Sequence, residues 1–528
     1  MPEPTAPGVC LEENPDYERS IPAAPASITA FIGRTRRGPV NRPVFIYSLH
    51  SFQRFFGGVW RESPLSHAVQ QYFENGGHAA VIVRVSNGGN RTTIDLPSGA
   101  DVLVLEANSP GSDENLRVSV DYDGIGDQET DRFNMVVQRV RHAGSELVED
   151  QEFFTRLSIR PESKRYVADL LLGSQLLRVR GDVPAARPDR TLSGRPGAAV
   201  AYIDANADGS DGEPLTDYDV IGSATDATGL FALSDIEQFN LLCIPALSPD
   251  RDAGPMTLLA AARYCVQRKA MLIVDPPADW HTADEACNGL RRLNFASENA
   301  ALFYPRVFAT DPETAQKFPI GPCGVVAGMI ARGDERASLW QALTGEGTLL
   351  RGTRPVTTLE PEEVDMLGSA GINAIAPCRT SFAVAGRART LAPEDWCRSG
   401  WSDFAARRTA LYIIGSLERG TRWVVFEKNE PRVWARVHNQ VTEFLHELYK
   451  EGAFLGDTPE QAYFVKCDAD TTTASDIERE IVHFIVGFAL ARPGNYFVFN
   501  FAQGVGESRV TPVGLDVSRY HGSGSGQR

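Results

Sequence analysis

The sequence predicts a multidomain protein of the α+β or α/β class, in which a discontinuous α/β core is interrupted by a mostly-β insertion and flanked by extended terminal arms. Strand and helix patterns alternate in residues 28–87 and resume in residues 236–505. Between these segments, residues 88–235 favour short strands separated by turn clusters. Residues 1–27 are rich in proline, and residues 506–528 end in a Gly/Ser run that is typical of a flexible extension.

Bulk composition narrows the class of protein. A chain of 528 residues is too long for one ordinary core, so two to four domains are expected. Its net charge of −16 disfavours nonspecific binding to nucleic acid or to an anionic membrane. No apolar run approaches the roughly 20 residues of a membrane span, and no secretory signal pattern is expected at the N-terminus. The eight cysteines stand singly, which is typical of reduced thiols in a cytoplasmic protein.

The N-terminal arm, residues 1–27, is expected to be extended. A short strand can form around Val9 and Leu11, but nothing nearby in the sequence pairs with it. Because an isolated strand is not stable alone, its partner must be a distant segment or another chain.

The first α/β segment begins with a strand over residues 27–33 and a second over 43–47. Ser48 can cap a short helix, and Ser63 followed by proline is a strong helix start. The apolar run 79–85 predicts a strand that is covered on both faces.

The insertion is expected to have strands at 101–106, 116–120 and 133–140, followed by a long surface excursion over residues 181–229. The second α/β segment is expected to alternate helices with strands. The expected helices cover 256–269, 284–295, 402–419 and 431–451. The expected strands cover 271–275, 301–304, 423–426, 462–465, 481–490 and 496–501.

One loop has metal-like spacing. Asp204, Asn206 and Asp208 precede Gly209 as in the first half of an EF-hand calcium loop. The twelfth place, which needs a bidentate glutamate, is Leu215. An Asp/Gly-rich surface loop is therefore the favoured interpretation, and a calcium-dependent binding module remains the alternative.

Asp275 raises the question of an enzyme, because it follows a parallel-type strand where α/β enzymes often keep catalytic groups. The sequence contains no phosphate loop, no HExxH zinc pattern and no GxSxG elbow. No cofactor is therefore expected. Asp275 is better interpreted as the cap of a following turn, and a soluble α/β enzyme that uses it remains a rival.

The expected helix over 431–451 is amphipathic. Its apolar stripe consists of Val433, Val437, Val441, Phe444, Leu445 and Leu448. Arg432 and Arg436 project together one turn apart, and Lys450 lies at the C-terminal end, where the helix dipole favours cations. The pattern fits either a solvated helix or a helix that docks on an acidic surface.

Short segments spread along the chain are similar to contractile tail sheath proteins of phage tails, tailocins and related injection systems. The segments that carry the resemblance are Ala30–Pro39, Phe55–Gly58, Tyr72–Gly77, Asn115–Val118, Phe239–Pro245, Leu272–Pro277, Arg422–Glu427, Glu430–Arg436, Gly452–Asp468 and Thr471–Ile477. Each fragment is weak alone, and their order and spacing give the match its specificity.

The resemblance implies a non-enzymatic subunit that polymerises around an inner tube and contracts to drive the tube through a target envelope. The implied partners are other sheath subunits, six to a layer, the inner tube protein, and baseplate and terminal cap proteins. Neither nucleic acid nor direct membrane insertion is implied. The implied location is the bacterial cytoplasm during assembly, and afterwards a phage tail or phage-tail-like particle.

The resemblance also assigns surfaces. The core would lie against the tube and the insertion would face outward, with the helix 431–451 as the attachment helix. Arg432, Arg436 and Lys450 would contact the tube. Strand addition between subunits would use the N-terminal arm at Val9 and Leu11. The C-terminal arm strand would contain Phe497, Phe499 and Phe501. The sequence leaves open which contractile machine this is.

Overall fold

The computed structural model describes most of the chain in two compact units. The described residues are 20–191, 201–336, 338–379, 381–393, 401–492 and 495–513. The larger unit comprises residues 25–405, and the smaller unit joins residues 20–24 to the chain from residue 406 onward. The predicted arm residues Val9 and Leu11 lie outside the described residues.

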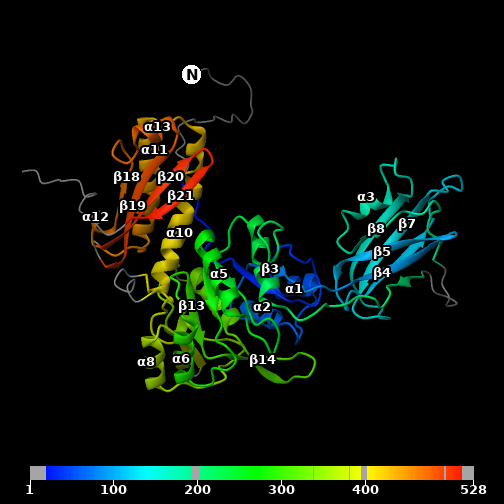
Figure 1. Cartoon of the computed structure of the whole chain (residues 1–528), viewed down its shortest axis with the longest axis horizontal. Coiled ribbons are helices and arrows are strands. Elements are labelled where there is room, and N and C mark those ends of the chain that lie inside the picture. The colour runs from blue at the N-terminus through cyan, green and yellow to red at the C-terminus, as the bar shows by residue number, and fades with distance from the viewer. Residues whose placement is uncertain are drawn as a thin grey trace, which may run out of the picture. The chain divides into compact units, whose positions relative to one another are not determined.

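The larger unit is built on a mixed eight-stranded sheet of order β17-β16-β13-β12-β11-β1-β3-β2. The bounds are β1 (Thr29–Gly33), β2 (Val44–Ile46), β3 (Ala80–Arg84), β11 (Leu241–Cys243), β12 (Met271–Val274), β13 (Ala300–Tyr304), β16 (Asn373–Cys378) and β17 (Ser381–Val384). β1 pairs in parallel with both β3 and β11, with Thr29 opposite Ala80 and Leu241. Strands from far apart in the sequence therefore share one sheet (Figure 1).

Helices cover both faces of this sheet. Their bounds are α1 (Leu49–Phe56), α2 (Pro64–Glu74), α5 (Pro255–Arg268), α6 (Ala283–Leu293), α7 (Cys323–Arg336) and α8 (Pro361–Ser369). Successive strand residues point to opposite faces. Ala30 and Ile32 join the cluster beneath α5, α6 and α8, whereas Phe31 meets Tyr72 of α2 with ring centroids 5.5 Å apart. Helix α7 packs on α2 so closely that a Cβ at Gly324 would lie 2.1 Å from the Ala68 carbonyl oxygen.

The insertion is a β-sandwich. One sheet has the order β10-β6-β7-β8 and the other has the order β4-β5-β9, and every pairing is antiparallel. The bounds are β4 (Arg91–Ser98), β5 (Asp101–Pro110), β6 (Leu116–Asp121), β7 (Arg132–Val140), β8 (Val148–Ser158), α3 (Val167–Leu171), β9 (Leu177–Val179) and β10 (Ile203–Asp204). Alternate residues of both sheets bury one shared apolar core.

The expected surface excursion over residues 181–229 is more ordered than composition alone indicates. Strand β10 pairs with β6, and α4 (Asp217–Ile221) and η1 (Gly229–Asp235) follow it. Leu215, Val220 and Leu230 are buried in the core of the α/β layers, although the sequence places them in the insertion. The hairpin β14 (Val307–Thr310) and β15 (Lys317–Ile320) and the short helix η2 (Gly345–Thr348) complete the larger unit.

The smaller unit combines helices with a four-stranded antiparallel sheet of order β18-β19-β20-β21. The bounds are α10 (Phe404–Gly420), η3 (Arg422–Phe426), α11 (Pro431–Lys450), α12 (Pro459–Ala462), β18 (Tyr463–Lys466), α13 (Ala474–Glu478), β19 (Val482–Arg492), β20 (Asn495–Gly504) and β21 (Glu507–Pro512). Residues 20–24 return to this unit, where the Ala24 amide donates to Ser416 Oγ of α10 at 3.3 Å.

Two local predictions are wrong. Residues 423–426, expected as a strand, form the 3-10 helix η3. Residues 507–512, expected to belong to a flexible extension, form β21, because β20 offers them a pairing edge. The expected mixed α and β multidomain fold class with a mostly-β insertion is confirmed. No helix within the described ranges is long and apolar enough to span a bilayer.

Candidate functional site

Helix α11 is the first surface that the sequence singles out, and its apolar stripe is confirmed. Five of its six predicted residues, Val433, Val437, Val441, Leu445 and Leu448, are buried and Phe444 is half-buried, so the helix packs on the smaller unit along one face. Its opposite face carries the predicted cations. Arg432, Arg436 and Lys450 are all exposed on it.

The predicted cations on α11 differ in their surroundings. The guanidinium of Arg436 stacks 4.3 Å above the Trp423 ring and donates to Glu427 Oε1 at 3.2 Å. Lys450 Nζ contacts Glu447 Oε1 at 2.7 Å, one turn back along the helix. Arg432 has no ion pair with any part of the chain that the structure describes. Arg432 is therefore the least engaged of the three cations.

Sequence reasoning missed the aromatic part of this surface, because it assigned residues 423–426 to a strand. In η3, Trp423 Nε1 donates to Gln440 Oε1 of α11 at 2.9 Å, which fixes the short helix against the long one. The Phe426 side chain is 90% exposed. We call Trp423, Phe426, Arg432 and Arg436 the α11 face. A pair of aromatic residues three apart, directly before a proline-initiated helix, was the signal available in the sequence.

The predicted C-terminal arm strand is an interior strand of the sheet. β20 pairs with β19 on one edge and with β21 on the other. Phe499 and Phe501 therefore pair with their own chain on both edges, whereas Phe497 lies opposite Phe488 of β19. Within the described residues, the edge strands of this sheet are β18 and β21. A role for the three phenylalanines in strand addition stays a prediction.

Ion pairs join the β-sandwich to the α/β layers. The loop after β1 supplies Arg37, whose guanidinium donates to Glu149 Oε2 at 2.8 Å. Arg54 of α1 meets Asp150 at 3.2 Å. Arg84, at the end of β3, is buried and donates to the Gly38 carbonyl at 2.8 Å, and burial lowers the pKa of Arg84 to about 10.

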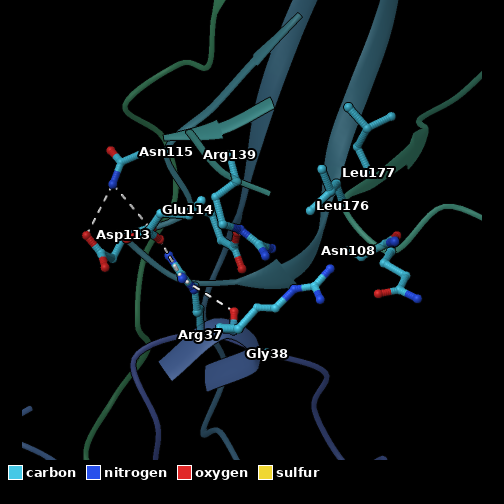
Figure 2. A network of polar contacts seen from close by, with 12 residues as sticks. Arg37, Gly38, Asn108, Asp113, Glu114, Asn115, Arg139, Leu176 and Leu177 are labelled. Atoms are coloured by element: carbon cyan, nitrogen blue, oxygen red, sulfur yellow. Dashed lines mark hydrogen bonds and ion pairs between the residues drawn. The ribbon is translucent and has the colours of Figure 1, made fainter. Parts of the chain in front are cut away.

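A buried ion pair within the sandwich lies next to these contacts (Figure 2). Arg139 donates to Glu114 Oε2 through Nε at 3.1 Å and through a terminal nitrogen at 3.0 Å. The Glu114 side chain is only 1% exposed and that of Arg139 only 8%. A buried pair of this kind is costly to break, because either partner alone would be an uncompensated charge.

The loop with calcium-like spacing is held by protein contacts. Asp208 accepts hydrogen bonds from the Thr93 amide at 2.9 Å and from the Thr93 hydroxyl at 2.7 Å. Asn206 donates to Asp95 Oδ2 at 3.0 Å, and Asp204 lies in β10. Across the described ranges, no group of three or more His, Cys, Asp or Glu side chains is arranged to hold a metal ion. The Asn206 and Asp208 side chains fasten the loop to β4.

Asp275 lies at the end of β12, as predicted, and caps a helix. Its Oδ1 accepts from the Cys323 amide at the start of α7 at 2.8 Å, and Oδ2 is enclosed without a hydrogen-bond partner. Burial raises the pKa of Asp275 to about 6. A Cβ at Gly321 would lie 2.0 Å from the Asp275 carboxyl carbon. The side chain is therefore tightly enclosed, as expected for a structural cap.

Comparison with known proteins identifies the fold. No protein-family model and no curated protein matches the sequence. The structure is similar to the contracted helical sheath of the anti-feeding prophage, with a TM-score of 0.54, 17% identity and coverage of 93% of this chain and 97% of that chain. It is also similar to a sheath tail protein from Listeria innocua, with a TM-score of 0.61, 13% identity and coverage of 92% and 96%.

A chain from the baseplate of the anti-feeding prophage, reconstructed with six-fold symmetry, is similar as well. The TM-score is 0.51 at 16% identity, and the match covers 93% of this chain and 97% of that chain. The fold is that of contractile tail sheath proteins. The fold expected from the sequence resemblance is thereby confirmed.

Proposed function

We propose that this protein is a structural subunit of a contractile sheath. Copies would polymerise around an inner tube, and contraction of the polymer would drive the tube through a target envelope. The observation that supports this most directly is the likeness of fold to sheath chains, which covers more than nine-tenths of both chains. In this role assembly surfaces replace an active site, and the protein is not an enzyme.

The proposed partners follow from this role. They are other copies of the chain, six to a layer, the inner tube protein, and baseplate and terminal cap proteins. The similarity to a chain of a six-fold symmetrised baseplate supports the layer number and the association with a baseplate. Assembly would take place in the bacterial cytoplasm, and the finished polymer would belong to a phage tail or a phage-tail-like particle.

The α11 face is proposed as the tube-contacting surface. It includes the exposed Phe426 side chain of η3 and the exposed Arg432 and Arg436 side chains of α11, and Lys450 lies at the far end of the same helix. Exposed ion pairs contribute at most about 1 kcal/mol each. A few such contacts around one aromatic anchor suit a subunit that must release the tube during contraction.

Strand addition between subunits is proposed to use β21. This edge strand pairs with β20 in a ladder that runs from Phe499 opposite Pro512 to Gly504 opposite Glu507. A β21 strand from a neighbouring copy can form the same ladder, so exchange conserves the hydrogen bonds while linking two chains. Phe497, Phe499 and Phe501 then belong to the receiving strand. The segment around Val9 and Leu11 is proposed as the second arm.

Electron microscopy of negatively stained protein, alone and co-expressed with its tube protein, tests the proposal. We expect hollow striated cylinders or sheathed tubes from the full chain. Uniform discrete particles under both conditions would contradict the sheath role.

Two truncations separate the role of β21 from a general effect of shortening. A chain that ends at Val505 lacks β21 and is expected to lose long cylinders. A matched chain that ends at Val513 keeps β21 and is expected to assemble. Equal assembly of both truncated chains would refute the role of β21 but not the sheath role. Deletion of residues 1–19 tests the second arm in the same way.

A further inference from the structure

An arginine-lined cavity in the larger unit is not used by the sheath role proposed above. The cavity has a volume of about 540 Å³, and Arg332, Arg336 and Arg351 line it together with Leu349, Leu350 and Ser381. At the junction with the β-sandwich, by contrast, arginines such as Arg37 meet carboxylates. Within the described ranges, none of the three cavity arginines has a carboxylate partner.

Arg332 lies at the base of this group and is held in place by backbone oxygens. Only 4% of the residue is exposed. Its guanidinium donates to the carbonyls of Asn75 at 2.8 Å, Leu349 at 2.7 Å and Gly347 at 3.2 Å. Burial lowers the pKa of Arg332 to about 10, and the charges of Arg351 and Arg336 act in the same direction. The backbone carbonyl dipoles therefore stabilise the buried positive charge of Arg332, and no carboxylate within the described residues neutralises it.

The other two arginines reach the cavity from different segments. Arg336 lies one turn beyond Arg332 at the end of α7, where a cation also complements the helix dipole. Arg351 lies beyond η2, and its backbone is fixed by Asn75, which accepts from its amide at 2.9 Å and donates to its carbonyl at 3.1 Å. The helix dipole does not account for Arg351, so the convergence of three cations needs another explanation.

We propose that this cavity binds an acidic peptide segment that carries two or more carboxylates. Guanidinium groups present paired donors that match the two oxygens of a carboxylate. The volume is in the range of sites for ligands much larger than a single ion. Leu349 and Leu350 offer apolar contact for the aliphatic part of glutamate side chains. The lining contains no aromatic ring on which a nucleotide base can stack, so a peptide fits better than a nucleic acid.

The nearby carboxylate of Glu74 does not already fill this role. Glu74 lies beside Gly352, where a Cβ would be 2.8 Å from its Oε2, and its Oε1 accepts from Gln70 at 2.8 Å. It pairs with none of the three arginines. The site is thus open to carboxylates from outside the described chain.

Fluorescence anisotropy with labelled hexaglutamate tests the proposal on the unpolymerised full-length chain. The site variant R336Q/R351Q changes two exposed side chains, and a matched control, R263Q/R292Q, removes two exposed arginines on α5 and α6. We expect binding to weaken about tenfold in the site variant, because two of the guanidinium groups that would pair with carboxylates are lost. The control variant is expected to bind as the natural chain does.

Three outcomes would overturn the proposal: equal loss in both variants, equal binding of labelled hexaglutamine, or no binding of hexaglutamate by the natural chain. Full displacement of hexaglutamate by inorganic phosphate at a comparable concentration would instead show a site for small oxyanions. That result would refute the proposal that the ligand is a peptide. If R336Q/R351Q does not fold, R336K/R351K preserves the charge and removes the paired donors, and it is expected to bind more weakly than the natural chain. Unchanged binding by that variant would also refute the proposal.

Discussion

Replacing Asp275 with asparagine is expected to stabilise the folded chain at neutral pH. Asp275 Oδ1 accepts from the Cys323 amide, whereas Oδ2 is enclosed without a partner. An asparagine in the same position preserves the accepting oxygen and removes the buried charge. Because burial raises the pKa of Asp275 from its ordinary value of 3.8 to about 6, the ionised form opposes folding.

The magnitude follows from proton linkage. Between about pH 4 and about pH 6 the folded chain holds a proton that the unfolded chain releases, so the free energy of unfolding falls as the pH rises. Above pH 6 both states are ionised and this loss is complete. The difference between the ordinary pKa of 3.8 and the pKa of about 6 in the folded chain corresponds to about 3 kcal/mol, at roughly 1.4 kcal/mol per pKa unit. Asp275→Asn is therefore expected to be up to about 3 kcal/mol more stable than the natural chain at neutral pH.

Urea unfolding, followed by far-UV circular dichroism on the unpolymerised chain, measures this difference at about pH 4.5 and about pH 7.5. The advantage of the asparagine variant is expected to grow with pH, and Asp279→Asn, at an exposed position nearby, is expected to show no such growth. A variant that is less stable at neutral pH, or an advantage that does not change with pH, would refute the reasoning. Cylinder formation is expected to persist, whereas an enzyme that used Asp275 would lose its activity.

Three further substitutions test the packing and surfaces described above. Gly324→Ala places a Cβ 2.1 Å from the Ala68 carbonyl oxygen, so α7 must move away from α2. The free energy of unfolding in urea is expected to fall by about 1–3 kcal/mol. An unchanged unfolding midpoint would contradict the close packing. Glu114→Gln leaves the buried Arg139 without a counter-charge, and a loss of about 3–5 kcal/mol is expected by the same measurement. Phe426→Ser changes an exposed ring, so stability is expected to stay the same while co-sedimentation with tube protein decreases; normal co-sedimentation would exclude Phe426 from the tube contact.

Helix α11 shows what local sequence pattern can predict. Its start at Pro431 and its buried stripe through Val433, Val437 and Val441 follow from capping preference and helical periodicity, which depend on near neighbours only. The prediction of a strand over the preceding residues 423–426 is wrong. Trp423 and its branched neighbours have strand-like composition, but the hydrogen bond from Trp423 to Gln440 and the stacking of Arg436 place it in a 3-10 helix.

Local sequence pattern also fails to predict strand β21 and the ordered end of the insertion, because both depend on tertiary contacts. Residues 507–512 contain no strong strand signal, and their order depends on pairing with β20. Leu215 and Val220 lie in a stretch rich in Asp and Gly, yet both are buried against the α/β layers. The free energy of these contacts comes from partners that are distant in sequence, so composition within a window does not reveal it.

Local sequence pattern is enough to predict the fold class, the alternation of strands and helices in the two core segments, the β character of the insertion and the amphipathic helix α11. All of these depend on periodicity and capping within about 20 residues. The tertiary structure alone decided which strands share a sheet, that Phe497, Phe499 and Phe501 lie inside one, and that three arginines from α7 and the loop beyond η2 converge on one cavity. These features are set by contacts between distant segments, whose packing and electrostatic free energies a single stretch of sequence does not contain.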